Sequence, residues 1–150
     1  MVSGVDFGRG GSALPMQFRV LGPDSGGPSP TEVRRLFKGQ RMTAARRSRL
    51  GQSGRILAMA GTRAVGLAAF ERSEREMRVT ELGVDPDSAG GTDQIVAGLL
   101  DALELSCMAS GTRRMVLLPR ATMATAVLRR RGYVSIGEGS AGSWFEKTFV

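Results

Sequence analysis

The chain has 150 residues, of which 41% are hydrophobic and 23% charged, as in one ordinary globular domain. It contains no histidine and one cysteine, Cys107, which excludes Ser-His-Asp and Cys-His catalysis, histidine-ligated metal sites and an intrachain disulfide. The net charge of +7 leaves two readings open, an anionic partner and a solvated basic surface.

The N-terminal segment lacks the features of a targeting signal. Residues 1–14 are rich in glycine and have neither a basic region nor an apolar core, which indicates a flexible tail. The longest apolar runs elsewhere are far shorter than the roughly 20 residues that a membrane helix needs. We therefore expect a single domain over residues 15–150, located in the cytoplasm and not in a membrane.

The first elements of this domain are a strand and two helices. Residues 16–21 alternate between apolar and polar side chains, as a strand does, and a loop of Gly, Pro and Ser follows. Ser29 or Thr31 is then expected to cap a helix. A second, strongly basic helix is expected over residues 42–50, and it ends where glycine follows.

Three antiparallel strands are expected next. Apolar runs cover residues 55–60 and 64–70, and the charged segment 71–76 is typical of an exposed turn before a strand over residues 77–84. In that last strand the apolar alternation shifts by one position at Thr80–Glu81. Such a shift favours a β-bulge, which places two residues opposite one and redirects the side chains around it.

The second half of the chain predicts a strand–helix–strand unit and then a helix and a hairpin. Apolar residues at helical spacing place Cys107 on the buried face of a helix over residues 93–110, with Thr92 as its cap and Gly111 after its end. The remaining expected elements are a buried parallel strand over residues 115–118, a short helix over 122–131 and strands over 133–136 and 144–149.

This order of elements, together with three local sequences, resembles the GNAT superfamily of N-acetyltransferases. Residues 81–86 are similar to the family's bulged fourth strand and its exit, and residues 89–94 lie where the family has its pyrophosphate loop. The apolar frame of a late helix is matched by Ala124, Val127, Gly132 and Tyr133. The resemblance implies an α/β (α+β) fold with a mixed, mostly antiparallel twisted sheet of about six or seven strands and helices on both faces.

The resemblance also implies an acyl-CoA site made of backbone groups, with no metal. In the family the bulge leaves N–H groups free for the thioester and the pantetheine arm, and the following helix N-terminus receives the pyrophosphate. The cofactor-binding residues carried over to this chain are Leu82, Gly83, Val84, Ala89, Gly90, Gly91, Thr92, Asp93 and Gln94. Acetyl-CoA, or another acyl-CoA, would be the co-substrate.

Several positions depart from the family's pattern. Ala89 stands where the family usually has Arg or Gln, and Thr92 and Gln94 stand where it has glycine. Asp93 places a negative charge at the helix N-terminus, where it stabilises the helix and competes with a phosphate. Leu128 replaces a tyrosine that protonates the departing thiolate. By themselves these residues favour a plain helix start over a phosphate site.

Glu81 is the candidate catalytic residue, because the family often places at the bulge a carboxylate that takes the amine's proton directly or through water. A surface glutamate is the equally weighted alternative. The sequence therefore predicts acetyl transfer to a primary amine, on a small molecule or a peptide, by direct attack. One alternative is a GNAT-fold module that has lost catalysis and binds acyl-CoA or a protein partner, with a homodimer left open. A nucleic-acid-binding domain is the weaker alternative, since it rests on charge alone.

Overall fold

The computed structural model describes residues 16–23, 26–38, 40–88, 91–122, 124–139 and 142–149, so the predicted tail over residues 1–14 lies outside it. The strands are β1 (Met16–Leu21), β2 (Gly54–Ala60), β3 (Arg63–Arg72), β4 (Met77–Val84), β5 (Arg114–Leu117), β6 (Val134–Gly139) and β7 (Gly142–Thr148). The helices are α1 (Pro30–Leu36), α2 (Ala44–Gln52), α3 (Thr92–Ala109) and α4 (Thr125–Arg130), with a short 3₁₀ turn η1 (Pro119–Ala121).

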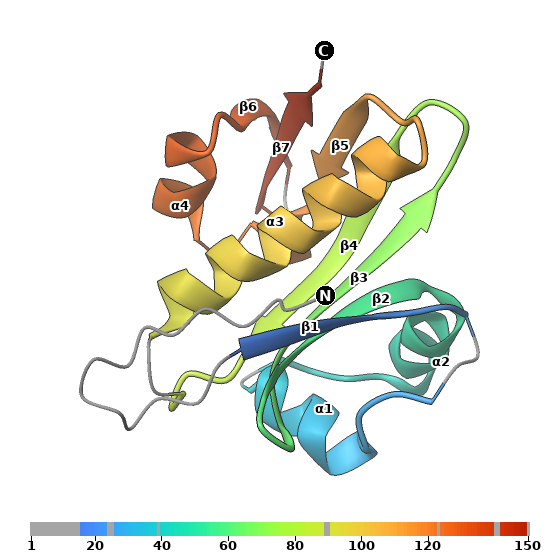
Figure 1. Ribbon diagram of the computed structural model, residues 1–150, viewed down its shortest axis with the longest axis vertical. Helices are drawn as coiled ribbons and strands as arrows, with labels where there is room; N and C mark the ends of the chain where they lie inside the picture. Colours follow the sequence, from blue (N-terminus) through green and yellow to red (C-terminus); the bar gives the residue numbers. More distant parts are fainter. Residues whose placement is uncertain are drawn as a thin grey trace.

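The described strands form one seven-stranded sheet in the order β1-β2-β3-β4-β5-β7-β6 (Figure 1). Every neighbouring pair is antiparallel except β4 and β5, which are parallel because α3 crosses over between them. The predicted element order and the mixed, mostly antiparallel sheet are confirmed. The apolar run predicted as a parallel strand over residues 115–118 is confirmed as β5, with its bounds shifted to Arg114–Leu117.

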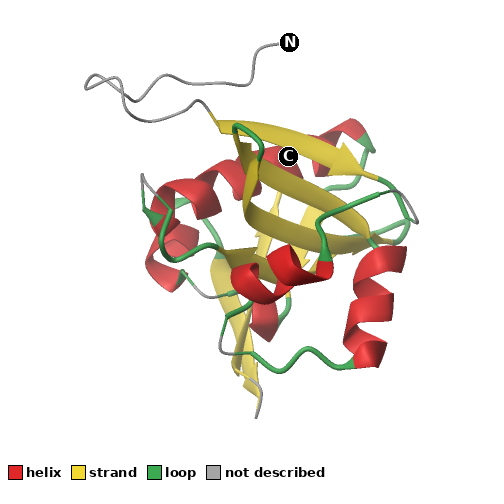
Figure 2. Cartoon of the chain, turned by 90° about the horizontal axis from the view of Figure 1, so that it is seen from below, coloured by secondary structure: helices red, strands yellow, loops and turns green. Residues whose placement is uncertain are grey.

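Helices cover both faces of this sheet, as predicted (Figure 2). On one face α3 and α4 pack over a core that includes Ile56, Leu99 and Cys107. On the other face α1 and α2 pack over a smaller core that includes Leu57 and Phe37. Ile56 and Leu57 are neighbours in β2 that point to opposite faces, so the strand is apolar from Ile56 onward instead of alternating.

Two glycines permit close packing against the central strands. A Cβ at Gly66 of β3 would lie 2.7 Å from Cγ2 of Ile95, on the α3 side. A Cβ at Gly83 of β4 would lie 2.7 Å from the Phe37 ring, on the α1 side. Both distances are too short for a side chain, so glycine lets α3 and the end of α1 approach the sheet.

The ends of several elements differ from the prediction. Ser29, and not Thr31, caps α1, because its hydroxyl accepts the Glu32 N–H while the Glu32 carboxylate accepts the Ser29 N–H. The N-cap of α3 is Gly91 at φ +83°, so Thr92 is a helical residue and not the cap. The helix expected over residues 122–131 is shorter, since Pro119 begins a separate 3₁₀ turn before α4.

The last two strands, β6 and β7, extend into the glycine-rich segment that the sequence predicts as their connecting loop.

Cys107 is fully buried, as its place in the helical pattern predicted, and burial raises the pKa of its thiol. Among the described residues, no helix is both long and apolar enough to cross a membrane.

Candidate active site

The sheet opens on one side of β4 halfway along that strand. The parallel ladder joins Met77–Val79 to Met115–Leu117 and is continued only by the N–H of Leu118, which donates to the Val79 carbonyl at 3.0 Å. Beyond that point β5 leads into η1, while β4 continues through Thr80–Val84. The second half of β4 therefore pairs with β3 alone, and its other edge faces the opening.

The bulge predicted in β4 is confirmed at this same point. Ala69 of β3 pairs with Glu81, and Phe70 pairs with Val79, which leaves Thr80 as the extra residue. The Thr80 hydroxyl donates to the Ala69 carbonyl at 3.3 Å and so holds the bulged segment against β3. A bulge bends its strand and strengthens the local twist, which separates β4 from β5.

The ladder to β3 decides which backbone groups of β4 face the opening. The N–H of Asp85 donates to the Val65 carbonyl at 2.9 Å. In an antiparallel pair, residues with backbone groups turned toward the partner strand alternate with residues whose groups turn away. Gly83 therefore uses its N–H and C=O on β3, whereas Leu82 and Val84 direct theirs toward the opening. These two are residues that the resemblance had placed at the thioester.

The side chains of this segment go to the two cores. Leu82 and Val84 are buried on the α3 side, in the larger core. Glu81 and Gly83 lie on the side of α1 and α2, where Gly83 contacts the Phe37 ring and Glu81 meets α2. One face of β4 at the bulge is thus apolar, and the other carries a buried carboxylate.

The Glu81 carboxylate is held in a fork by Arg46 of α2. The Nε and Nη2 atoms of Arg46 donate to Oε2 and Oε1 of Glu81 at 2.8 and 2.6 Å. Both side chains are buried, with exposed fractions of 6% for Glu81 and 8% for Arg46. Two parallel charge-assisted hydrogen bonds in a buried place fix the carboxylate's position strongly. This partner was not predicted from the sequence.

Other groups complete the arrangement around Arg46. Its Nη2 also donates to Oε1 of Gln40 at 2.6 Å, and its Nη1 donates to the Arg41 carbonyl at 3.0 Å. The guanidinium carbon lies 5.5 Å from the centre of the Phe37 ring. On the solvent side, Nη1 of Arg120 lies 3.4 Å from Oε2 of Glu81. The signal that could have revealed Arg46 is its i, i+4 spacing from Leu50, since both occupy the buried stripe of α2.

A second buried carboxylate, missed in the sequence, fixes the exit of β4. Asp85 is fully buried and accepts hydrogen bonds from Arg35 at 2.8 Å, from Arg63 at 2.9 Å and from the Asp87 N–H at 2.9 Å. Burial by itself would raise the pKa of the Asp85 carboxyl, but these hydrogen bonds outweigh it, and the pKa lies below its ordinary value of 3.8. The turn toward α3 is therefore tied to both α1 and β3.

The N-terminus of α3 is free of side-chain capping in the described part of the chain. Gly91 is the N-cap, and no side-chain hydrogen bond reaches the first turn, which contains Thr92, Asp93 and Gln94. A first turn without a cap leaves backbone N–H groups available to an anion, although exposed Asp93 brings a negative charge to the same place. The remaining predicted loop residues, Ala89 and Gly90, lie outside the described residues.

The tyrosine position expected near the leaving group is apolar and buried. Leu128 of α4 belongs to the larger core. Tyr133, the chain's single tyrosine, is committed elsewhere, because its hydroxyl donates to Oε2 of Glu104 at 2.8 Å. Burial, with the nearby negative charge of Glu104, raises the pKa of Tyr133. Neither residue is arranged to give a proton at the opening of the sheet.

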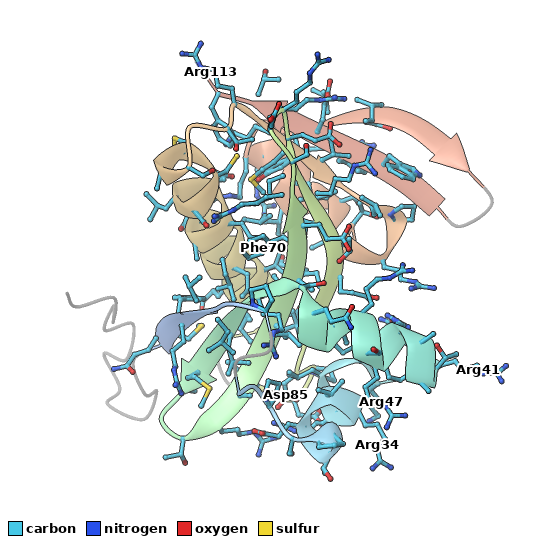
Figure 3. All side chains as sticks on the ribbon, turned by 90° about the vertical axis from the view of Figure 1, so that its right-hand side faces the viewer. Arg34, Arg41, Arg47, Phe70, Asp85 and Arg113 are labelled. Atoms are coloured by element: carbon cyan, nitrogen blue, oxygen red, sulfur yellow. The ribbon has the colours of Figure 1, made fainter. Side chains whose placement is uncertain are left out.

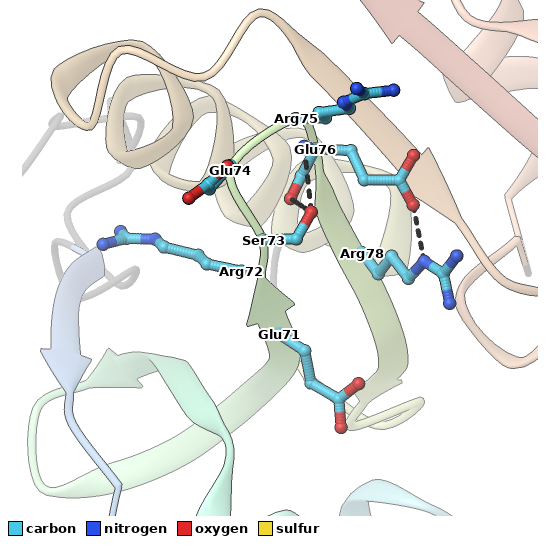
Figure 4. A pocket seen from close by; sticks show the side chains of 7 residues that line it. All are labelled: Glu71, Arg72, Ser73, Glu74, Arg75, Glu76 and Arg78. Atoms are coloured by element: carbon cyan, nitrogen blue, oxygen red, sulfur yellow. Dashed lines mark hydrogen bonds and ion pairs between the residues drawn. The ribbon is translucent and has the colours of Figure 1, made fainter.

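A hollow of about 570 Å³ lies at the β3–β4 hairpin, at the end of β4 away from the bulge (Figure 4). Its wall contains charged residues from 71 to 78, and the Glu76 carboxylate is already paired with Arg78 and with Arg114. These ion pairs stabilise the hairpin, and the hollow has no part in the site at the bulge.

Comparisons of sequence find no relative, since no protein-family model matches the chain and no curated protein matches it. Comparisons of structure find many. A ribosomal-protein alanine N-acetyltransferase from Escherichia coli aligns with a TM-score of 0.67 at 12% identity, covering 89% of this chain and 94% of that one. An N-acetyltransferase from Staphylococcus aureus aligns with a TM-score of 0.66 at 12% identity, covering 89% of this chain and 97% of that one.

The PaiA N-acetyltransferase from Thermoplasma acidophilum, whose structure contains coenzyme A, gives a TM-score of 0.55 at 14% identity. That alignment covers 63% of this chain and 60% of the other, so this chain matches less than two thirds of it. Together with the bulged β4, the opening beside β5 and the order of the sheet, these likenesses show that the chain has the GNAT fold.

Proposed function

We propose that this protein transfers an acyl group, most simply acetyl, from acyl-CoA to a primary amine. The observation that carries the proposal is the free edge of β4, where the backbone groups of Leu82 and Val84 face an opening in the sheet. Preorganised N–H groups of this kind stabilise the negative charge that develops on a carbonyl oxygen during acyl transfer. The structural likeness to N-acetyltransferases supports the same reaction class.

The residues around the opening fit an acyl-CoA in two places. We assign the N–H groups of Leu82 and Val84 to the thioester and pantetheine arm, and Gly83 to the packing that holds them there. The pyrophosphate is assigned to the first turn of α3, at Gly91, Thr92, Asp93 and Gln94, continuing into Ala89 and Gly90. Acyl-CoA supplies the activated acyl thioester.

In the proposed reaction the amine nitrogen attacks the carbonyl carbon, a C–N bond forms and the C–S bond breaks. Glu81 accepts the proton from the amine, directly or through one water molecule. An ionised carboxylate has about four lone-pair sites; Oε2 of Glu81 accepts from Arg46 and Arg120, whereas Oε1 accepts from Arg46 and keeps capacity for one more hydrogen bond. Leu128 has no proton to give, so water or the substrate ammonium supplies the proton to the thiolate. Arg46 is a positioning residue in this scheme.

A second candidate function is favoured by the same ion pair. Both Glu81 oxygens already accept hydrogen bonds from Arg46, and the position of Leu128 is apolar. A GNAT-fold module that binds acyl-CoA without transferring its acyl group, with or without a protein partner, would have these features. The two candidates agree on cofactor binding and differ only on catalysis.

Release of thiol from acetyl-CoA over a panel of primary amines tests the proposal. For an enzyme, we expect amine-dependent thiol release that Glu81→Gln lowers by about 10²–10⁴-fold in kcat. The control is Glu74→Gln, which removes an exposed carboxylate at the distant hairpin and should leave the rate unchanged. Because Glu81→Gln also disturbs the ion pair, its pH–rate profile is needed, and loss of the limb on the acid side marks Glu81 as the base.

Thermal unfolding with and without acetyl-CoA separates the two candidates, because a ligand that binds the folded state raises the midpoint. A raised midpoint without thiol release for any amine would favour the binding module. If acetyl-CoA does not raise the midpoint and no amine releases thiol, both candidate functions are contradicted.

A further inference from the structure

Almost all of the chain's net positive charge lies in one segment. Residues 30–52, which include α1 and α2, contain seven basic residues and one acidic residue, a net charge of +6 out of +7 for the whole chain. These two helices cover the Glu81 side of the sheet. The charge is therefore a property of one face of the molecule and not an even solvated surface.

Two of these seven cations have structural partners, and five do not. Arg35 is paired with Asp85, and Arg46 is paired with Glu81. The other five are exposed and make no side-chain hydrogen bond or ion pair with any described residue; they are Arg34, Lys38, Arg41, Arg47 and Arg49. We call these five residues the basic face.

The basic face contains a shaped hollow as well as charge. Arg34, Arg41 and Arg47 project from α1, from the segment before α2 and from α2 toward the same side of the molecule (Figure 3). Between the two helices is a hollow of about 340 Å³, lined by Pro30, Val33, Arg34, Gln40, Met42 and Arg47. Two guanidinium groups above a partly apolar floor suit a carboxylate on a short aliphatic stem.

Two side chains, those of Gln40 and Arg46, connect this hollow to the candidate catalytic residue Glu81. Gln40 lines the hollow, and its Oε1 atom accepts a hydrogen bond at 2.6 Å from Nη2 of Arg46. The same Nη2 atom donates to Glu81. A ligand seated between α1 and α2 is thus one residue away from the ion pair that holds the proposed base.

The composition of the basic face favours a peptide over a nucleic acid. Single-stranded nucleic acid is bound by positive grooves that also offer exposed aromatic rings for stacking. Phe37 is the one aromatic residue among residues 30–52, and it is 2% exposed. Three of the five cations, Lys38, Arg41 and Arg49, do not line the hollow, which a single small carboxylate would occupy alone.

We infer that the basic face binds an acidic polypeptide segment, and that the amine acceptor is a peptide with Asp or Glu side chains close to its reactive amine. The hollow between Arg34 and Arg47 takes one of these carboxylates, while Lys38, Arg41 and Arg49 attract the rest of the segment. The role of this peptide as acyl acceptor rests on the proposed function, whereas its binding to the basic face does not.

Fluorescence anisotropy tests this inference with a labelled oligoglutamate peptide that has a free amino terminus. We expect it to bind, with affinity that falls as ionic strength rises, while the matched oligoglutamine peptide does not. Arg34→Gln/Arg47→Gln should weaken binding by about tenfold or more. The control variant Arg75→Gln/Arg113→Gln removes the same charge from exposed arginines elsewhere, with Arg113 far from the basic face in Figure 3, and should bind as the wild type does.

Three results would overturn the inference: no binding of oligoglutamate, equal weakening by the two double variants, or tighter binding of an oligouridylate RNA than of oligoglutamate. The assay contains no acyl-CoA, so its outcome is independent of catalysis. If oligoglutamate binds and no amine releases thiol, the proposed function fails and the binding surface stands. If neutral amines react and oligoglutamate does not bind, only the inference fails.

Discussion

The free edge of β4 and the α1–α2 face lie next to each other and are made of different chemistry. Along the edge, the groups available to a ligand are backbone groups of Leu82 and Val84, whose side chains are buried in the core. On the α1–α2 face, the available groups are charged side chains, from the Arg46–Glu81 pair outward to the basic face.

The chain shares its fold with structural neighbours at 12–21% sequence identity. A bulge and an open ladder supply the same N–H groups whichever apolar side chains surround them. The α1–α2 face, in contrast, offers a ligand the charged groups of particular side chains.

The largest effect is expected from Arg46→Met. Removing the guanidinium takes away the two hydrogen bonds that hold the buried Glu81 carboxylate and leaves it beside the more distant, exposed Arg120, which should lower the free energy of unfolding by about 3–5 kcal/mol. Chemical denaturation measures this. The double variant Arg46→Met/Glu81→Gln should lose much less than the sum of the single losses. Additive losses would show that the two side chains are not coupled.

The next largest effect is expected for Asp85→Asn. It should lower the free energy of unfolding by about 2–3 kcal/mol at neutral pH, because the hydrogen bonds from Arg35 and Arg63 lose their charged acceptor. The pKa of Asp85 is lower in the folded chain than its ordinary value of 3.8, so its stabilisation is present above that value and is lost as the pH falls through the folded-state pKa. Denaturation curves across acid pH should therefore be flatter for the variant. An equally steep acid loss in the variant would contradict this account of Asp85.

A smaller effect is expected for Gly83→Ala, because the new methyl group would press on the Phe37 ring. Overpacking of this kind costs about 1–3 kcal/mol, and Phe37→Leu in the same chain should restore part of it. Gly137→Ala is the control, since a Cβ there would meet no atom within 4 Å. If Gly83→Ala lowers the free energy of unfolding no more than the control does, β4 and the Phe37 ring do not pack this closely.

The smallest effect is expected for Asp93→Asn, which changes the charge at the N-terminus of α3 and leaves the α1–α2 face untouched. Loss of the negative charge should destabilise α3 by about 0.3–1 kcal/mol, yet should tighten acetyl-CoA binding a few-fold, because the charge competes with the pyrophosphate. Calorimetric titration with acetyl-CoA measures the second part. Weaker binding by the variant would place the pyrophosphate somewhere other than the α3 N-terminus.

Much of the fold could be predicted from the sequence, because each strand and helix has its own periodicity and its own turn residues. The bulge was visible as a change of alternation at Thr80, and the parallel strand as an unbroken apolar run. Both signals are local, and both concern the edge built from backbone.

The ion pairs of Arg46 with Glu81 and of Arg35 with Asp85 could not be predicted in the same way. Each joins residues at least 35 positions apart in the sequence. The spacing of Arg46 from Leu50 indicates that Arg46 is on the buried side of its helix, but no local pattern identifies the carboxylate that it meets. The N-cap of α3 was misassigned for a related reason, since Thr92 is a good cap by type and only the positive φ of Gly91 moves the helix start.

Hydrogen exchange at single residues of β4, with and without acetyl-CoA, tests the central claim most directly. The account predicts that acetyl-CoA slows exchange of the Leu82 and Val84 amides, while the Gly83 amide, already bonded to β3, changes little. Unchanged exchange at Leu82 and Val84 under saturating acetyl-CoA would contradict the claim that the free edge of β4 receives the thioester.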